Sequence, residues 1–314
     1  MSATLFAWVI VATVIAVACA SVLRAPRAAT ETSGPWRSAF RRIRARRSAR
    51  VGLAVLTALA TLTLFAPALS PYDPTYQPDS VGLAGRPPSP DHIFGTDGVS
   101  RDVFSRVLHG ARVSLRVALL AVIVSMTFGT AYGAIAGFVG GTVDAAMMRL
   151  IDIFLSIPRV LLLILVTVAW DRLSVTALTL LIGLTGWFGV SRIVRAQVMT
   201  LSAREFVLSA RAIGARAPRL VLRHILPNAL SPVVVAATLA VGNVIILEAA
   251  LSFLGLGVQQ PAASWGSIVK DGVDLIYTAW WISLFPGLAI VVTVMSLNAV
   301  GEGLRDALDA RDPT

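Results

Sequence analysis

Residues 117–138 read VALLAVIVSMTFGTAYGAIAGF, a run with no charged side chain. The hydrocarbon core of a bilayer is roughly 30 Å thick and needs about 20 apolar residues in a helix, because no backbone group can stay unpaired in lipid. The run is therefore predicted to be a membrane-spanning helix. Further apolar runs predict spans at 5–23, 52–69, 157–170, 174–192, 231–251 and 281–300.

The composition agrees with an integral membrane protein. Of the 314 residues, 56% are hydrophobic and only 14% are charged, which is more apolar surface than a soluble core of this size can hide. The net charge of +10 comes mainly from arginines, with Lys270 as the only lysine, and they gather in a few breaks between apolar runs. Topology explains this pattern better than nucleic-acid binding. Cys19 is the only cysteine, so neither a disulfide within the chain nor a cysteine-based metal cluster is expected.

The basic residues also predict which segments face the cytoplasm. Segment 24–50 holds nine arginines and one glutamate, and segment 192–224 holds seven arginines and Glu205 alone. Both are expected inside, whereas 70–115 and 255–280 mix both signs of charge and are expected outside. The expected organisation is an extra N-terminal span with an Arg-rich segment (1–50), a first core span with an external loop (51–115), and the remaining core (116–314). The preference for arginine over lysine fits a bacterial plasma membrane.

Small residues recur at every fourth position of the third span. They are Ser125, Gly129, Gly133, Gly137 and Gly141. Positions i and i+4 share a helix face, so this stripe predicts close approach of another helix. The partner helix can belong to this chain or to another subunit, and the sequence leaves both open.

A few ionisable residues lie near or within spans. Asp144, Arg149 and Asp152 stand at the start of the fourth span, and Glu248 stands late in the sixth. Such groups are costly in lipid and often functional. Asp152 follows Arg149 by three residues on one helix face, so a local ion pair is predicted, with a substrate role as the alternative.

No catalytic or metal site is expected. The chain contains no G-x-x-x-x-G-K-[ST], H-E-x-x-H or G-x-S-x-G motif. Its three histidines fall in segments assigned to opposite sides of the membrane. An intramembrane hydrolase relying on Asp152 or Glu248 remains a weak alternative, as does a channel or receptor that needs no ATPase.

The break at 202–227 is predicted to be a folded element on the cytoplasmic side. Ser202 and Glu205 fit a capping box, which starts a helix at 203, and Gly214 ends that helix. Pro218 suits the first turn of a second helix, which Pro227 is expected to end. Such a unit can rest on lipid headgroups, or it can insert its aliphatic face into a groove of a soluble partner.

The stretch EFVLSARAIGARAPRLVLRHILPN (205–228) resembles the cytoplasmic "EAA" loop of ABC-importer permeases, with the pattern E-A-A, three residues, Gly, nine residues, I-x-L-P. Aligning Gly214 and Leu226-Pro227 places the triplet on Leu208, Ser209 and Ala210, of which only Ala210 matches. His224 stands where the pattern has Ile. R-H-I-L-P-N is typical of the C-type permeases of dipeptide, oligopeptide and nickel importers. Segments 92–115, 148–164, 246–266 and 285–309 are similar to the same subfamily, and the likeness covers about 50–310.

The resemblance implies an all-α transmembrane bundle of the type I importer permease kind, with six core spans besides the extra N-terminal one. It implies a subunit that translocates di- or oligopeptides, with nickel or another small solute as the alternative. The implied partners are a homologous second permease, one or two cytoplasmic ATPases that hold the ATP and Mg²⁺, an external substrate-binding protein or lipoprotein, and the bilayer.

The resemblance also assigns residues. The ATPase-coupling loop is assigned to Glu205, Ala210, Arg211, Ala212, Ile213, Gly214, Arg223, Ile225, Leu226 and Pro227. An external motif, whose role stays open, comprises Gly95, Thr96, Asp97, Arg101 and Asp102.

Overall fold

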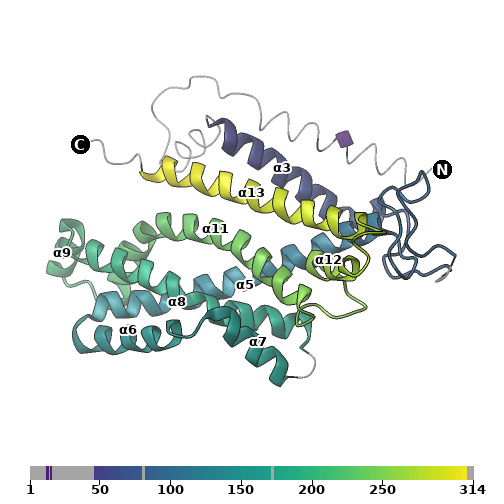
Figure 1. Cartoon of the computed structure of the whole chain (residues 1–314). Helices are drawn as coiled ribbons and strands as arrows, with labels where there is room; N and C mark the ends of the chain where they lie inside the picture. The colour runs from purple at the N-terminus through teal and green to yellow at the C-terminus, as the bar shows by residue number, and fades with distance from the viewer. Residues whose placement is uncertain (1–11, 14, 16–45, 80–81, 171–172, 310–314) are drawn as a thin grey trace. The chain divides into compact units, whose positions relative to one another are not determined.

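A computed structural model describes residues 12–13, 15, 46–79, 82–170 and 173–309 of the chain (Figure 1). This part is helical and contains no strand, only one isolated bridge between Thr96 and Asp102. The all-α prediction is therefore confirmed. The helices are α3 (Arg47–Leu64), α4 (Ala66–Leu69), α5 (Val103–Val139), α6 (Gly141–Leu155), α7 (Arg159–Ala169), α8 (Val175–Ser202), α9 (Glu205–Ala212), α10 (Ala217–Arg219), the π-helix η1 (Leu220–Ile225), α11 (Leu226–Phe253), α12 (Trp265–Val273) and α13 (Trp281–Asp309).

Five of the described helices are long and apolar enough to cross a membrane, or up to six spans if a bent pair is one of them. The bent pair is α6 and α7, whose axes differ by 72°. The predicted short span at 157–170 corresponds to α7, which has only 11 residues and covers roughly 16 Å, so it is too short to cross a bilayer without α6. Pro158 explains the break: it has no N–H to donate and keeps the preceding residue from continuing the helix.

The other core spans lie where the apolar runs predicted them, with longer helices than expected. The 37-residue α5 extends the predicted span 117–138 back to Val103, and a continuous helical stretch from Ala217 to Phe253 contains the predicted span 231–251. The run 52–69 is divided between α3 and α4. The predicted N-terminal span at 5–23 lies outside the described residues, apart from three isolated positions.

The chain divides into two compact units. The first contains the described residues of 1–118, 172–178 and 241–314. In it α3 and α13 lie side by side (Figure 1), and a Cβ added to Gly52 of α3 would stand 2.7 Å from the backbone oxygen of Ser296 in α13. The missing side chain at Gly52 therefore lets these two apolar helices touch through their backbones.

The second unit contains the described residues of 119–171 and 179–240. Here the small-residue stripe of α5 lies against α8. A Cβ on Gly129 would stand 2.7 Å from the Val190 Cβ, and one on Gly137 would stand 2.7 Å from the Arg195 carbonyl oxygen. Gly133 is tighter still, since its Cβ would stand 2.3 Å from the Ser191 carbonyl oxygen. The stripe thus packs within the chain at these three positions.

Gly141 does not belong to this packing stripe, contrary to the prediction. It follows the end of α5 at Val139, has a positive φ of 58°, and has no atom within 4 Å of its ideal Cβ position. Its neighbour Gly140 also has a positive φ, of 67°. The two glycines form the turn between α5 and α6, where left-handed backbone favours residues without a Cβ.

Replacing Gly133 with Val tests the tight seam between α5 and α8. The new side chain would meet the Ser191 carbonyl oxygen and the Val194 Cβ, so the helices must separate. We expect a loss of stability of about 1–3 kcal/mol or more, since overpacking a tight contact is destabilising. Thermal unfolding of the detergent-purified protein measures this loss.

Gly189→Val is the matched control, because Gly189 lies on α8 and has no atom within 4 Å of its ideal Cβ position. The control is expected to unfold close to wild type. Equal melting temperatures for Gly133→Val and Gly189→Val would contradict the tight packing.

Candidate functional site

The segment between α8 and α11 is a compact helical projection, here named the knob and defined as residues 203–225. Helix α9 carries Glu205 in its first turn and ends with Ile213 as its C-cap. Gly214 follows with a φ of +86°, a conformation that favours glycine, and the chain then enters α10 with a proline in its first turn. The predicted helix, glycine break and second helix are confirmed.

The predicted capping box at the start of the knob was wrong. Ser202 is the last residue of α8, and its hydroxyl donates to the Val198 carbonyl at 2.6 Å. The N-cap of α9 is Arg204, which makes no side-chain capping bond. The hydroxyl is therefore used by the helix that ends rather than by the one that starts.

The predicted end of the second helix at Pro227 was also wrong, because the helix continues through this proline into α11. The π-helix η1 ends immediately before α11 begins at Leu226. The Leu226 N–H donates to the Val221 carbonyl, five residues earlier in the chain. Proline needs no acceptor, and the wider turn separates its ring from the carbonyl that it would meet in a regular α-helix. The knob is thus continuous with the long helix that follows.

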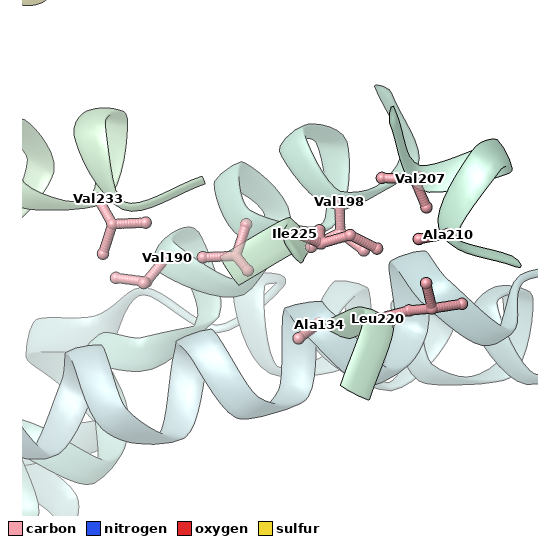
Figure 2. Close-up of a cluster of buried hydrophobic side chains, with 9 residues drawn as sticks. Ala134, Val190, Val198, Val207, Ala210, Leu220, Ile225 and Val233 are labelled. Carbon is pink, nitrogen blue, oxygen red and sulfur yellow. The ribbon is translucent and has the colours of Figure 1, made fainter. Parts of the chain in front are cut away.

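The base of the knob is a small hydrophobic core. Figure 2 shows Val207 and Ala210 of α9 facing Leu220 and Ile225 of η1, with Val198 of α8 between them. Val198, Val207 and Ile225 are fully buried. Val190, Val194, Ala134 and Val233 complete the cluster. This packing attaches both short helices of the knob to α5 and α8.

The tip of the knob is apolar and exposed. Ile213 is 87% exposed, and Phe206, Leu208 and Leu222 are exposed as well. An exposed set of large apolar side chains marks a surface that contacts either a partner protein or the membrane. Leu208 stands in the triplet position where the EAA pattern departs from this chain, and here it contributes to the apolar surface.

The residues assigned to the coupling loop therefore separate into two groups. Ala210 and Ile225 are buried in the base, while Glu205, Ala212, Ile213, Gly214 and Arg223 are exposed. Arg211 lies with its guanidinium 5.9 Å from the centre of the Phe138 ring of α5, a cation–π contact that turns it toward the base. Leu226 and Pro227 begin α11.

In the first unit, the external motif forms a buried ionic cluster. The Asp97 carboxylate accepts hydrogen bonds from Arg101 Nε and Arg106 Nη1, both at 2.6 Å. Both arginines also donate to Asp271, which follows 165 residues after Arg106. Two positive and two negative charges balance in this cluster. Sequence reasoning missed Arg106 and Asp271, because no local spacing connects them to the motif.

The rest of the motif forms the frame around this cluster. Asp102 pairs with His92 at 2.9 Å and accepts from the Ser105 N–H at 2.7 Å. The Thr96 carbonyl accepts from the indole N–H of Trp281, and an added Cβ at Gly95, whose φ is +73°, would collide with that indole. The motif is thus a folded loop fixed to α13 in the same unit.

The span-end charges pair over long sequence distances. Asp152 of α6 is bonded to Arg192 of α8, so the predicted local pair with Arg149 was wrong. Asp144 pairs with Arg195, also on α8, through both of its carboxylate oxygens. These ion pairs join α6 to α8 within the second unit, and they give the two carboxylates a structural partner.

Glu248 is fully buried in the first unit among serine hydroxyls. Its Oε1 accepts from Ser252 at 2.6 Å and its Oε2 accepts from Ser114 at 3.1 Å. Ser114 in turn accepts from the Trp265 N–H at 3.1 Å, and Ser252 accepts from Ser264. The carboxyl group therefore connects α5, α11 and the start of α12.

Comparison with known proteins gives a consistent picture. Residues 129–311 match the family described as "Binding-protein-dependent transport system inner membrane component", and residues 34–88 match the "N-terminal TM domain of oligopeptide transport permease C". The oligopeptide transport system permease protein OppC of Bacillus subtilis is 40% identical over 88% of this chain and 90% of its own length. The dipeptide transport system permease protein DppC of Alkalihalophilus pseudofirmus is 41% identical over the same shares.

Among solved structures, a chain of the MetNI methionine ABC transporter in inward-facing conformations is similar in fold. Its TM-score is 0.54, its identity is 19%, and the match covers 65% of this chain and 97% of that one. At this identity the match speaks for the fold alone. It confirms the predicted importer-permease architecture.

Proposed function

The chain belongs to the family of binding-protein-dependent transport system inner membrane components, and from this premise we propose that it is the C-type permease subunit of an ABC importer for di- or oligopeptides. The observation that carries the proposal is the identity of about 40% to oligopeptide and dipeptide permeases along nearly the whole chain. The proposed location is the bacterial plasma membrane.

The proposed complex contains four kinds of protein. This chain pairs with a homologous second permease to form the path, and one or two cytoplasmic ATPases bind ATP and Mg²⁺ and supply the energy. An external substrate-binding protein or lipoprotein delivers the peptide. The knob supports this arrangement, because it combines a buried base with an apolar tip that is exposed in the single chain.

In the proposed mechanism, closure of the ATPase pair displaces the knob, and rigid-body movement of the spans alternates access to the two sides. A displacement can be transmitted only by an element that does not deform. The packing of Val207 and Ile225 on Val198 meets this requirement, as does the unbroken helical path from η1 into α11.

Gentle purification from native membranes tests the proposal. A tagged chain is expected to co-purify with a second permease and with ATPase subunits. After reconstitution with the external binding protein, the complex is expected to accumulate labelled di- or oligopeptides when ATP is supplied. Uptake of nickel in place of peptides would overturn the proposed substrate, and purification of the chain alone would overturn the proposed assembly.

A further inference from the structure

A hollow of about 350 Å³ lies beside the exposed tip of the knob. It is lined by the turn around Gly214 and by Arg219, Arg223 and His224, together with Ala210, Ile213 and Ala215. All of these residues belong to the second unit. The hollow therefore combines two cationic side chains with the exposed apolar side chain of Ile213.

The two arginines of the rim have no counterion in the described part of the chain. No hydrogen bond or ion pair there involves the guanidinium of Arg219 or Arg223, and both residues are exposed. Glu205 is the only acidic residue in 202–228, and it does not line the hollow. Arg192 and Arg195 of the second unit pair with aspartates, and Arg211 lies over Phe138. Arg149, Arg204 and Arg216 are exposed like the two arginines of the hollow but do not line it.

Two guanidinium groups at one hollow suit a carboxylate better than a single cation does. Guanidinium presents its N–H donors in a planar fork that matches a carboxylate in two-pronged contacts. A flat layer of lipid headgroups contacts the protruding parts of a protein surface. A hollow is filled better by a side chain that protrudes from another protein. The apolar Ile213 beside it also requires a cover that has an apolar part.

We propose that this hollow receives an acidic side chain of the cytoplasmic ATPase, held by Arg219 and Arg223 while Ile213 enters an apolar depression next to it. The inference rests on the proposed coupling function and adds the chemistry of the partner surface. The charge pair contributes discrimination between ATPases, because an ATPase without the acid leaves two cations desolvated and unpaired.

The double variant Arg219→Glu/Arg223→Glu tests the inference in the complete permease pair. Binding of the co-purifying ATPase is measured in neutral-lipid nanodiscs, and in parallel in nanodiscs with anionic lipid, over about 0.05–0.5 M NaCl, a range across which charge attraction is progressively screened. Wild-type affinity is expected to fall with salt. At low salt, the affinity of the double variant is expected to be at least roughly tenfold lower than that of the wild type. Its affinity is no longer expected to fall as the salt concentration rises.

Arg216→Glu is the matched control, since Arg216 is exposed on the same segment but does not line the hollow. It changes the same charge and is expected to retain most of the affinity and its salt dependence. The neutral variant Arg219→Gln/Arg223→Gln is expected to show a smaller loss than the double glutamate. Elution of each variant with the second permease on size exclusion checks assembly.

Two results would overturn the inference. One is a double glutamate variant that binds ATPase like Arg216→Glu at every salt concentration. The other is a loss of binding that occurs only when the nanodiscs contain anionic lipid, which would identify headgroups as the ligand. The proposed function fails separately, if the wild-type permease pair binds no ATPase at all.

Discussion

Ile213→Asp is expected to abolish ATP-driven uptake while the chain still folds and assembles with its second permease. Ile213 is 87% exposed at the tip of the knob and contributes nothing to the buried base. In the proposed complex this side chain enters a groove of the ATPase, where an unpaired carboxylate is costly to bury. Central contacts of this kind contribute about 2–4 kcal/mol, which corresponds to roughly 30- to 1,000-fold in affinity.

The measurements are peptide uptake and stimulation of ATP hydrolysis in reconstituted complexes. Ile213→Leu serves as the control, because it keeps an apolar side chain of equal size and is expected to retain most of the activity. A melting temperature close to wild type shows that the Asp variant is folded. Normal uptake by a folded Ile213→Asp complex would remove the coupling role from the knob.

Asp97→Asn is expected to be the most damaging single change for folding of the external loop. The Asp97 side chain is 1% exposed and Arg106 is 2% exposed, so the cluster is shielded from water. Asparagine would leave Arg101 and Arg106 with only the charge of Asp271 to balance them. Breaking a buried ion pair by removing one partner costs about 3–5 kcal/mol.

Thermal unfolding in detergent and the yield of membrane-inserted protein measure this loss. Asp91→Asn is the matched control, since Asp91 precedes the same motif and is exposed with no ion pair among the described residues. The control is expected to behave like wild type. If both variants unfold at the same temperature, the Asp97 cluster is not a stabilising element of the loop.

The sequence predicted those features that depend on neighbours along the chain. Apolar runs gave the spans, because the bilayer imposes one length on every crossing helix. Gly214 and Pro218 marked the turn of the knob, because each restricts the backbone in a way that a single residue reveals. The glycines spaced four residues apart from Gly129 to Gly137 identified the closely packed face of α5. The structure shows that this face packs against α8.

The sequence could not predict partners that meet only after folding. Arg149 stood three residues from Asp152, but the carboxylate is bonded to Arg192, which is 40 residues away. Asp271 completes the Asp97 cluster from a distance of 165 residues or more. Ser202 matched the sequence pattern of a helix cap, but its hydroxyl donates to the Val198 carbonyl in the preceding turn of α8. Local sequence spacing therefore suggests possible hydrogen-bond and ion-pair partners, but it does not reveal a competing partner that lies far away in the sequence.

The glycine seam between α5 and α8 also limits where anything can permeate. At Gly129 and Gly137 the space beside the backbone cannot hold even one methyl carbon, since its centre would stand 2.7 Å from the neighbouring helix. A water molecule needs at least that much room and also polar partners. The contact between these two helices along residues 129–137 therefore leaves no room for water, ions or peptides, and any path through the protein must run elsewhere.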